Sequence, residues 1–305
     1  MDKRPWRFRV WAVTGGCLSA AVGGCRLWID VDDPQCKDDQ TCVALLGEAA
    51  TCGPDDVCRR ASQLGTTADG VRALPGRWSC ARAPAERVAL DPSRSVRVRM
   101  DVVDISRLRV PPGLIGGACL ADDADCTKPF VQNIAPGGDG FMELALPYAF
   151  QGYLRLEAPD YLPVLAYNTR PYTETTSTRG PPMIKQGALE VLAAASSSSA
   201  SRGLALLDVR DCNDAAGEGV SFDDVDGQAA FYFEGAGPSP SLTQTVISNQ
   251  LSAGREPRAM GGFSDLEPGA TTFRVVLPES GEVVGRVTVA IRAGHITYVR
   301  LRAGD

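Results

Sequence analysis

Hydrophobic and polar residues alternate with a period of two along much of the chain after residue 76. The clearest run, from Val96 to Asp101, alternates valine and methionine with arginine and aspartate, which predicts a half-buried strand with an arginine-lined outer face. Further runs of strand-forming composition lie between turns rich in glycine, proline and aspartate. They span residues 141–146, 153–157, 164–167, 229–233, 271–277, 287–291 and 296–301.

The last two of these runs are separated by a short turn, so we expect them to form a hairpin that ends the chain. A different pattern occupies Ile184–Ala195, whose leucine and alanine content predicts a short helix, followed by the serine run 196–199. The sequence therefore predicts a mainly β fold with two Ig-like β-sandwiches, residues 77–180 and 203–305. A helix and serine-rich hinge at 181–202 would join them.

The first 24 residues have the composition of an export signal. Residues 1–9 are basic, and Val10–Val22 is mostly apolar but shorter than the roughly 20 residues that a membrane-spanning helix needs. Small residues follow before Cys25, and the sequence Val22-Gly23-Gly24-Cys25 resembles the lipobox of bacterial lipoproteins. That resemblance implies acylation of Cys25, which would become the first mature residue and tether the protein to a membrane.

Two alternatives to lipidation at Cys25 remain open. A similar but poorer motif ends at Cys17, and ordinary cleavage would leave Cys25 free or bridged. By the same resemblance, Arg26 in place of an aspartate favours the outer membrane over retention in the inner membrane.

Cysteine parity supports lipidation at Cys25. The chain has ten cysteines, and removing Cys17 with the leader and acylating Cys25 leaves an even number that can pair completely. We expect Cys119 to pair locally with Cys126, and Cys80 to pair with Cys212 across a long separation. The eight disulfide candidates are Cys36, Cys42, Cys52, Cys58, Cys80, Cys119, Cys126 and Cys212.

Residues 25–60 form a small cysteine-rich stalk, which is followed by a linker at 61–76. A piece of this length cannot build a core of its own, so disulfides are expected to hold it. Zinc is disfavoured because the spacing lacks C-x2-C pairs and the segment has no histidine.

The segments Asp211-Cys212, 262–269 and 289–301 together resemble a carboxypeptidase-regulatory-like, prealbumin-type sandwich. Residues 96–165 have a similar but weaker layout. The whole chain, with its cysteine-rich stalk, resembles uncharacterised lipoproteins of myxobacteria. The resemblance implies a β-sandwich at 203–305 and brings no catalytic residues with it.

Composition argues against enzymatic chemistry and against binding to nucleic acid. The formal charge is −6, and an acidic protein repels phosphate backbones. His295 is the single histidine, so a histidine-based zinc site or a Ser-His-Asp triad has too few candidates. We therefore expect no enzyme and no cofactor, although a hydrolase using carboxylates alone remains an unfavoured alternative.

Two sets of residues are candidates for ligand binding. Acidic loops could bind calcium, although a solvated turn is the preferred interpretation. Their residues are Asp122, Asp123 and Asp125, and Asp223, Asp224 and Asp226. Tyrosines clustered near the end of the first sandwich could form an exposed surface for sugars or peptides. They are Tyr148, Tyr153, Tyr161, Tyr167 and Tyr172.

The expected function is that of a non-catalytic envelope lipoprotein, a structural or adhesive scaffold that presents β-sandwich surfaces. The alternative is a module that binds glycan or peptidoglycan. Its expected partners are the membrane, through the lipid, and a protein or glycan of the cell envelope.

Overall fold

The computed structural model divides into two compact units, Met1–Ser62 and Gln63–Asp305. The described residues are 50–52, 58–60, 76–82, 88–121, 123, 125–186, 201–235, 237–239, 241–248 and 257–305. In the first unit β1 (Ala50–Cys52) pairs antiparallel with β2 (Cys58–Arg60), so that Cys52 lies opposite Cys58 along the backbone. The leader, Cys25, Cys36 and Cys42 lie outside the described residues.

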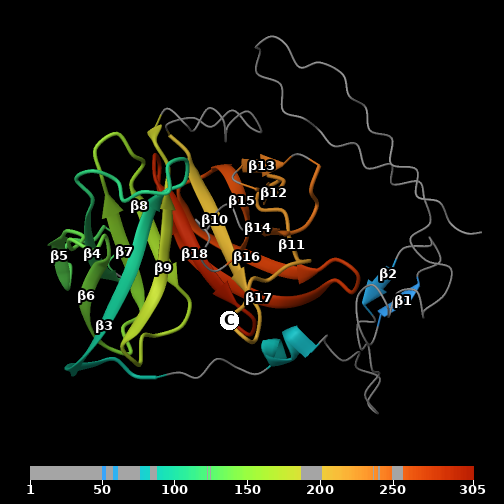
Figure 1. Cartoon of the computed structure of the whole chain (residues 1–305), viewed down its shortest axis with the longest axis horizontal. Coiled ribbons are helices and arrows are strands. Elements are labelled where there is room, and N and C mark those ends of the chain that lie inside the picture. Colours follow the sequence, from blue (N-terminus) through green and yellow to red (C-terminus); the bar gives the residue numbers. More distant parts are fainter. Residues whose placement is uncertain are drawn as a thin grey trace, which may run out of the picture. The chain divides into compact units, whose positions relative to one another are not determined.

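In the described residues of the second unit the regular elements are strands apart from one short 3-10 helix, which confirms the predicted mainly β class (Figure 1). Its elements are η1 (Gly76–Arg82), β3 (Asp91–Asp104), β4 (Ile115–Leu120), β5 (Val131–Ile134), β6 (Met142–Tyr148), β7 (Gly152–Glu157), β8 (Val164–Asn168), β9 (Thr176–Met183), β10 (Gly203–Arg210), β11 (Ser221–Phe222), β12 (Phe231–Glu234), β13 (Gly237–Ser239), β14 (Ile247–Ser248), β15 (Arg258–Leu266), β16 (Gly269–Leu277), β17 (Glu282–Ile291) and β18 (Ile296–Arg302).

A long sheet runs through both halves of this unit, residues 77–180 and residues 203–305. Its strand order is β13-β12-β15-β10-β18-β8-β7-β4-β5, with β14 added beside β15. The last strand of the described chain, β18, joins the halves because it pairs parallel with β10 on one side and parallel with β8 on the other. Residues 77–180 and 203–305 thus share one sheet.

A smaller sheet packs on each face of the long one. The sheet β6-β3-β9 and the sheet β11-β16-β17 lie on opposite faces, as alternate residues of β10 show. Leu204 and Leu206 belong to a first hydrophobic core, which contains Val98 of β3. Leu207 belongs to a second hydrophobic core, which contains Phe273 of β16. Every residue of β10 is therefore buried.

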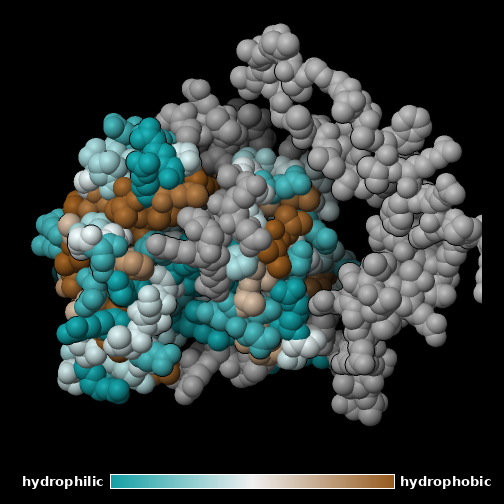
Figure 2. Space-filling view, in the orientation of Figure 1, coloured by the Kyte–Doolittle hydropathy of each residue, from teal (hydrophilic) through white to brown (hydrophobic). Residues whose placement is uncertain are grey.

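The outer face of β16 and β17 is polar. Figure 2 shows hydrophilic side chains over much of these two strands, and Arg274, Arg286 and Thr288 are exposed there. Their inward neighbours, such as Phe273 and Val289, are buried in the second core. This half therefore follows the period-two pattern of a half-buried sheet.

Three predicted elements differ from the structure. The run from Val96 keeps its alternation through Met100, but Asp101 is buried instead of continuing the exposed face. The runs 287–291 and 296–301 do not form a hairpin: β17 pairs with β16, whereas β18 enters the long sheet. The reason is burial, because β18 is covered on both faces. The second strand of a terminal hairpin would instead leave one face open to solvent.

The helix predicted from Ile184 does not begin there. Ile184 is fully buried, its carbonyl accepts a hydrogen bond from the Leu162 backbone, and Lys185 forms a β-bridge with Tyr161. Hydrophobic anchoring against the first core overrides the helical propensity of this stretch. The rest of the predicted helix and the serine run lie outside the described residues.

The two disulfides expected from the sequence outside the stalk are present. Cys80 in η1 bonds to Cys212 after β10, with the Cα atoms 5.7 Å apart. Cys119 bonds to Cys126 across the loop that follows β4, with the Cα atoms 5.3 Å apart. The first bond ties η1 to the long sheet, and the second closes a seven-residue separation.

Candidate functional site

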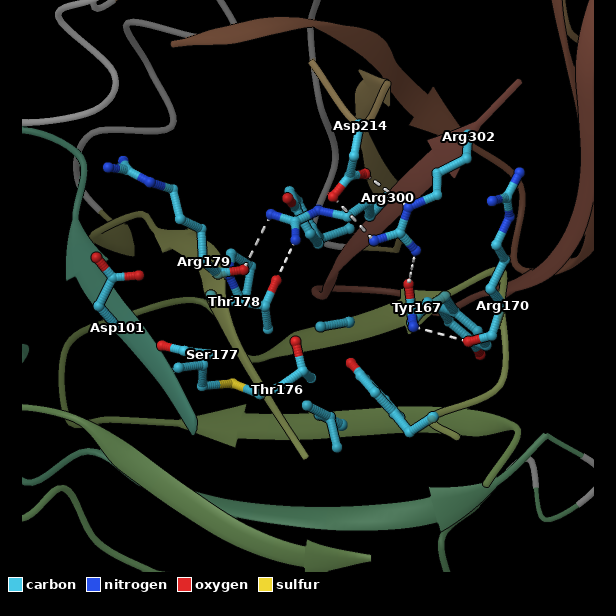
Figure 3. Close-up of a pocket in the computed structure, with 18 of the residues that line it drawn as sticks. Asp101, Tyr167, Arg170, Thr176, Ser177, Thr178, Arg179, Asp214, Arg300 and Arg302 are labelled. Carbon is cyan, nitrogen blue, oxygen red and sulfur yellow. Dashed lines mark hydrogen bonds and ion pairs between the residues drawn. The ribbon is translucent and has the colours of Figure 1, made fainter. Parts of the chain in front are cut away.

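A cleft of about 660 Å³ opens where the carboxyl ends of β8 and β18 meet the start of β9 (Figure 3). Residues Asn168–Glu174, which connect β8 to β9, line part of it, and β9 contributes the run from Thr176 to Pro181. The ends of parallel neighbouring strands lie at the same edge of a sheet, so β8 and β18 deliver their last side chains to one place.

Strand β18 positions the charged groups of the cleft through its alternation. Val299 and Leu301 point into the second core. The intervening residues Tyr298, Arg300 and Arg302 point to the opposite face and line the cleft. A strand that is buried on both sides thus presents two guanidinium groups and a phenol on one face.

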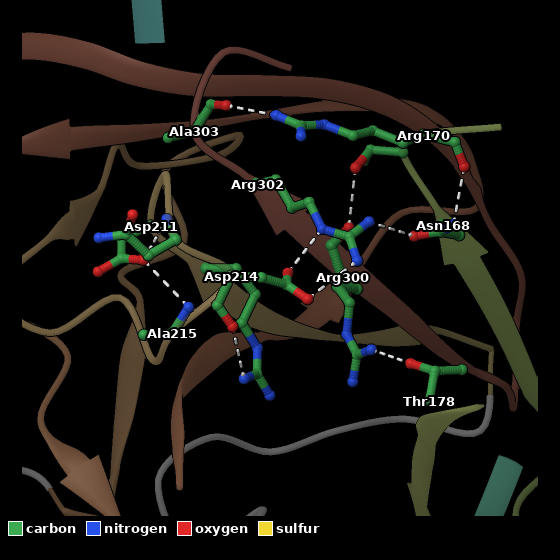
Figure 4. Close-up of polar contacts among 12 residues, drawn as sticks. Asn168, Arg170, Thr178, Asp211, Asp214, Ala215, Arg300, Arg302 and Ala303 are labelled. Carbon is green, nitrogen blue, oxygen red and sulfur yellow. Dashed lines mark hydrogen bonds and ion pairs between the residues drawn. The ribbon is translucent and has the colours of Figure 1, made fainter. Parts of the chain in front are cut away.

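The Arg302 guanidinium at the side of the cleft is fixed by hydrogen bonds to two side chains (Figure 4). Its Nε and Nη2 donate to the two carboxylate oxygens of Asp214 at 2.7 and 3.4 Å, and its Nη1 donates to Asn168 Oδ1 at 3.2 Å. Burial raises the pKa of Asp214, but the bonds and charge of Arg302 outweigh it and lower the pKa from its ordinary value. Asp214 is therefore an ionised partner of Arg302.

Arg170 occupies the rim of the same cleft. Its Nη2 donates to the Ala303 carbonyl at 2.8 Å, and its Nε lies 3.2 Å from Asp305 Oδ1. The side chain is 44% exposed, so it can reorient towards a ligand at small cost.

Arg300 is the most deeply buried arginine that lines the cleft, with 9% of its side chain exposed. Its Nη1 donates to Thr178 Oγ1, and its Nη2 donates to the Arg179 carbonyl at 3.2 Å. Burial lowers the pKa of Arg300, but the nearby Tyr298 and Asp208 outweigh it, so the pKa is raised and the guanidinium stays charged.

Behind Arg300 lies a buried cluster centred on Asp208 of β10. The Tyr298 hydroxyl donates to Asp208 Oδ2 at 2.6 Å, and Arg210 Nε lies 3.3 Å from Oδ1. Arg258 Nη1 and Arg300 Nη2 lie 3.7 and 3.5 Å from Oδ2. Asp208, Arg210 and Arg258 are at most 2% exposed.

The charge of this cluster fixes the protonation of Asp208. Burial alone would raise its pKa, but the positive charges of Arg210, Arg258 and Arg300 outweigh burial and lower the pKa well below its usual range. The Nε atoms of Arg258 and Arg300 are buried and have no hydrogen-bond partner among the described residues. The region behind the cleft is thus rich in positive charge.

The sequence patterns used above did not predict a role for Arg210, Arg300 or Arg302. A signal was available, because Asp208 interrupts the apolar run 204–209 and Arg300 interrupts the run 296–301, and each run is followed directly by an arginine, Arg210 or Arg302. Charged residues within strands buried on both faces must be paired or must face a site.

The five predicted tyrosines do not form an exposed surface, so that hypothesis is wrong. Tyr153 and Tyr161 are buried, and Tyr148, Tyr167 and Tyr172 are half-buried. The prediction rested on their clustering in the sequence, whereas both faces of β7 and β8 are covered in part.

The tyrosines make different contacts, ring packing in one case and a buried hydrogen bond in another. Tyr153 and Tyr167 pack against each other with ring centres 5.2 Å apart, and Tyr161 donates to Asp104 Oδ2 at 2.6 Å. Burial raises the pKa of Tyr161 to about 12 with help from Asp104, and burial raises that of Tyr167 to about 12 with help from Tyr153. Tyr167 and Tyr172 both line the cleft.

The predicted acidic loops do not gather into a metal site. Among the described residues no group of three histidine, cysteine or acidic side chains could hold a metal ion. Asp123 accepts hydrogen bonds from the Thr127 and Lys128 backbones at 2.9 and 2.8 Å, and Asp223 pairs with Arg274 at 2.8 Å.

The other acidic candidates do not form a metal-binding group with Asp123 or Asp223 among the described residues. Asp125 is exposed and lies 3.8 Å from Arg292, and Asp226 occupies a tight turn with positive φ. Neither Asp224 nor Asp226 joins a metal-binding group in the described part of the chain, and Asp122 lies outside the described residues. His295 is half-buried in the turn before β18, where its Nδ1 lies 2.8 Å from the Ala293 carbonyl.

Comparisons with known proteins give no family for this chain. No family model matches it, so the resemblance to a prealbumin-type module has no such support, and no curated protein matches it. Within the described residues no helix is long and apolar enough to cross a membrane.

Several solved structures match parts of this chain at very low similarity. The Bacillus anthracis TIE protein matches at 11% identity and a TM-score of 0.21 over 68% of this chain and 33% of that chain. The shaft pilin spaA from Lactobacillus rhamnosus GG matches at 9% and 0.23 over 70% and 99%. A family 26 carbohydrate-binding module of Eubacterium rectale Amy13K, in complex with maltoheptaose, matches at 11% and 0.22 over 70% and 94%. This chain spans about a third of the TIE chain, and similarities of this size say nothing of its function.

Proposed function

We propose that this chain is an exported, lipid-anchored, non-catalytic binding protein of the bacterial cell envelope, and that its cleft binds a glycan. Export and anchoring rest on the leader and on the lipobox-like sequence ending at Cys25. The outer membrane is the proposed location, because Arg26 replaces the aspartate that would favour retention.

The observation that supports glycan binding is the chemistry of the cleft lining. Hydroxyl and amide groups predominate among its small side chains, from Asn168, Thr173 and the run Thr176–Thr178. Tyr167 and Tyr172 add ring surface, and the arginines add fixed donors. A polyhydroxylated ligand matches such a lining better than an apolar one, because it can satisfy many donors and acceptors at once.

The state of Asp214, one of the acidic residues that line the cleft, favours binding over hydrolysis. A glycoside hydrolase needs one carboxyl group with a raised pKa as general acid beside a second carboxylate. Here the pKa of Asp214 is lowered by Arg302, which holds both of its oxygens. A paired, ionised aspartate is suited to fixing an arginine and not to donating a proton.

A scaffold without a ligand is the second candidate, and one observation favours it. The long sheet and the Cys80–Cys212 bond link both halves of the described part of the second unit, as an envelope protein under mechanical force would need. The two candidates differ in whether the cleft is occupied, which a binding experiment decides.

Isothermal titration of the full exported chain with purified cell-wall glycan fragments tests the proposal. We expect saturable binding that weakens about ten-fold in a double variant, Thr176→Val with Ser177→Ala, because each lost hydrogen bond costs about 0.5–1.5 kcal/mol. The matched control, Thr272→Val with Thr288→Ala, removes two hydroxyls from the outer face of β16 and β17 and leaves the affinity unchanged. Binding that is equal in both double variants would place the ligand elsewhere.

The anchoring half of the proposal has its own test. Intact mass spectrometry of membrane-fraction protein is expected to show a chain starting at Cys25 with added acyl mass. Alkylation after reduction is expected to label eight thiols. A mature chain without acyl mass, or thiols that react before reduction, would contradict the lipoprotein assignment.

A further inference from the structure

We infer that the cleft is selective for acidic glycans, saccharides that carry a carboxylate, and that Arg300 forms the centre of an anion subsite within it. This inference rests on the proposed function, since it names the class of glycan that the same cleft takes. It goes further because it assigns a charge to the ligand and a residue to its recognition.

The first step is the placement of positive charge. Arg170, Arg179, Arg300 and Arg302 all line the cleft, brought there by β18, by β9 and by the connection between β8 and β9 (Figure 3). Guanidinium groups are weakly hydrated and match the planar geometry of a carboxylate, so this lining suits an anionic oxygen group.

The second step is the pairing of three nearby acids, Asp208, Asp214 and Asp305; Asp101 and Glu174 also line the cleft. Asp214 is held by Arg302 through both carboxylate oxygens, and Asp305 lies against Arg170. Asp208 is shared among three arginines: Arg258 and Arg300 lie against Oδ2, and Arg210 lies against both oxygens. Among the described residues of this cluster, three guanidinium groups, those of Arg210, Arg258 and Arg300, lie against the single carboxylate of Asp208, so positive charge exceeds negative charge there.

The third step is that the guanidinium groups carrying this excess positive charge are buried. Arg258 is 2% exposed and Arg300 is 8% exposed, so water screens their charges little. Their Nε atoms are buried without a hydrogen-bond partner in the described part of the chain. Arg300 alone of these two lines the cleft, so the field of the buried cluster reaches a ligand through it.

The fourth step is preorganisation. Arg300 is fixed by Thr178 Oγ1, by the Arg179 carbonyl and by Asp208 before any ligand arrives. Because Thr178 Oγ1 accepts from Arg300, its own hydrogen remains able to donate to a ligand oxygen. A carboxylate beside Arg300 would gain this hydrogen bond and the attraction of the cluster without reordering the site.

A matched pair of ligands tests the inference: trigalacturonate and its methyl ester, which differ in charge and hardly in shape. With the full exported chain we expect the acid to bind at least ten-fold more tightly than the ester at low salt. This ratio should shrink as ionic strength rises, because part of the attraction is screened. Arg300→Gln should reduce the ratio about ten-fold, because it removes the charge that favours the acid over the ester.

Two further variants keep the test decisive. Thr178→Val retains every charge and should still lower the ratio several-fold, so it serves if Arg300→Gln fails to fold. Arg286→Gln removes an exposed arginine of β17 and should leave the ratio unchanged.

Each result separates the two proposals. Equal affinity for acid and ester, or a ratio that both cleft variants leave intact, would overturn the acidic-glycan inference while glycan binding stands. Acetate binding as tightly as trigalacturonate would overturn it too, since the cleft would then be a site for simple anions. Failure of acid and ester alike to bind would overturn the proposed function together with this inference.

Discussion

At the scale of single residues, stability depends on how buried charges are paired, and Asp208 is the extreme case. It is fully buried against Arg210, Arg258 and Arg300. Asp208→Asn should lower the free energy of unfolding by about 3–5 kcal/mol, because it leaves buried guanidiniums without their carboxylate. Urea denaturation measures this, and Asp223→Asn is the control: its partly exposed pair with Arg274 should be worth about 0–1 kcal/mol. A loss for Asp208→Asn no larger than for the control would contradict the assignment.

The same residue sets an acid limit on stability. The pKa of Asp208 is lower in the folded protein than its ordinary value, so ionisation contributes stability that is fully present above the unfolded-state pKa. That contribution is lost as pH falls from about 4 towards the lowered pKa. Urea midpoints measured between pH 7 and pH 2 should therefore fall steeply below about pH 4. The fall should be shallower in Asp208→Asn, which has no carboxyl group to protonate at this position.

At the scale of elements, the contact between β10 and β15 leaves no room for a side chain at Gly262. A Cβ there would overlap the Ala205 carbonyl oxygen, a backbone atom that cannot move aside alone. Gly262→Ala should thus destabilise the protein by about 1–3 kcal/mol through overpacking. Gly237 of β13 faces open space, so Gly237→Ala should be close to neutral in the same thermal-denaturation experiment. Similar melting temperatures for the two variants would show that β15 can shift away from β10.

The disulfides act on elements at very different separations. Cys80–Cys212 closes 132 residues and holds η1, where the Arg77 carbonyl also accepts from the Cys212 backbone. On the loop-entropy model its removal by paired serine substitution should cost about 5 kcal/mol, against about 2 kcal/mol for Cys119–Cys126. Denaturant titration of the two double-serine variants measures the difference. A larger loss for the short loop would mean that strain or local packing, and not chain entropy, governs these bonds.

Elements whose burial is one-sided were predictable from the sequence, and those buried on both sides were not. Val96, Val98 and Met100 face one core while Arg97 and Arg99 face solvent, as the alternation predicted. In β10 and β18 both faces are covered, so alternation carries no information about which face is which. The cleft was missed for the same reason: Arg300 and Arg302 look like surface residues until the neighbours of β18 are known.

At the scale of the whole molecule, pairing across long sequence separations decides the architecture. Ile296 of β18 lies opposite Val164 of β8 and opposite Leu204 of β10. No local pattern encodes such parallel contacts, which explains why the sequence suggested a terminal hairpin instead. The cleft exists because of this arrangement, since it brings the ends of β8, β9 and β18 together.

The shared sheet predicts that both halves of the second unit unfold together. Leu204, Leu206 and Tyr298 belong to the same core as Val98 and Leu144, so neither half buries its apolar residues without the other. Hydrogen exchange read by mass spectrometry should give β7 and β16 the same free energy of opening, equal to that from denaturant titration. Residues 88–186 and 201–305, expressed separately, should each lack cooperative unfolding. A fragment that folds alone, or strands that open at well-separated free energies, would mean that the halves are independent domains. In that case the cleft, which needs β9 and β18 together, would depend on docking between them.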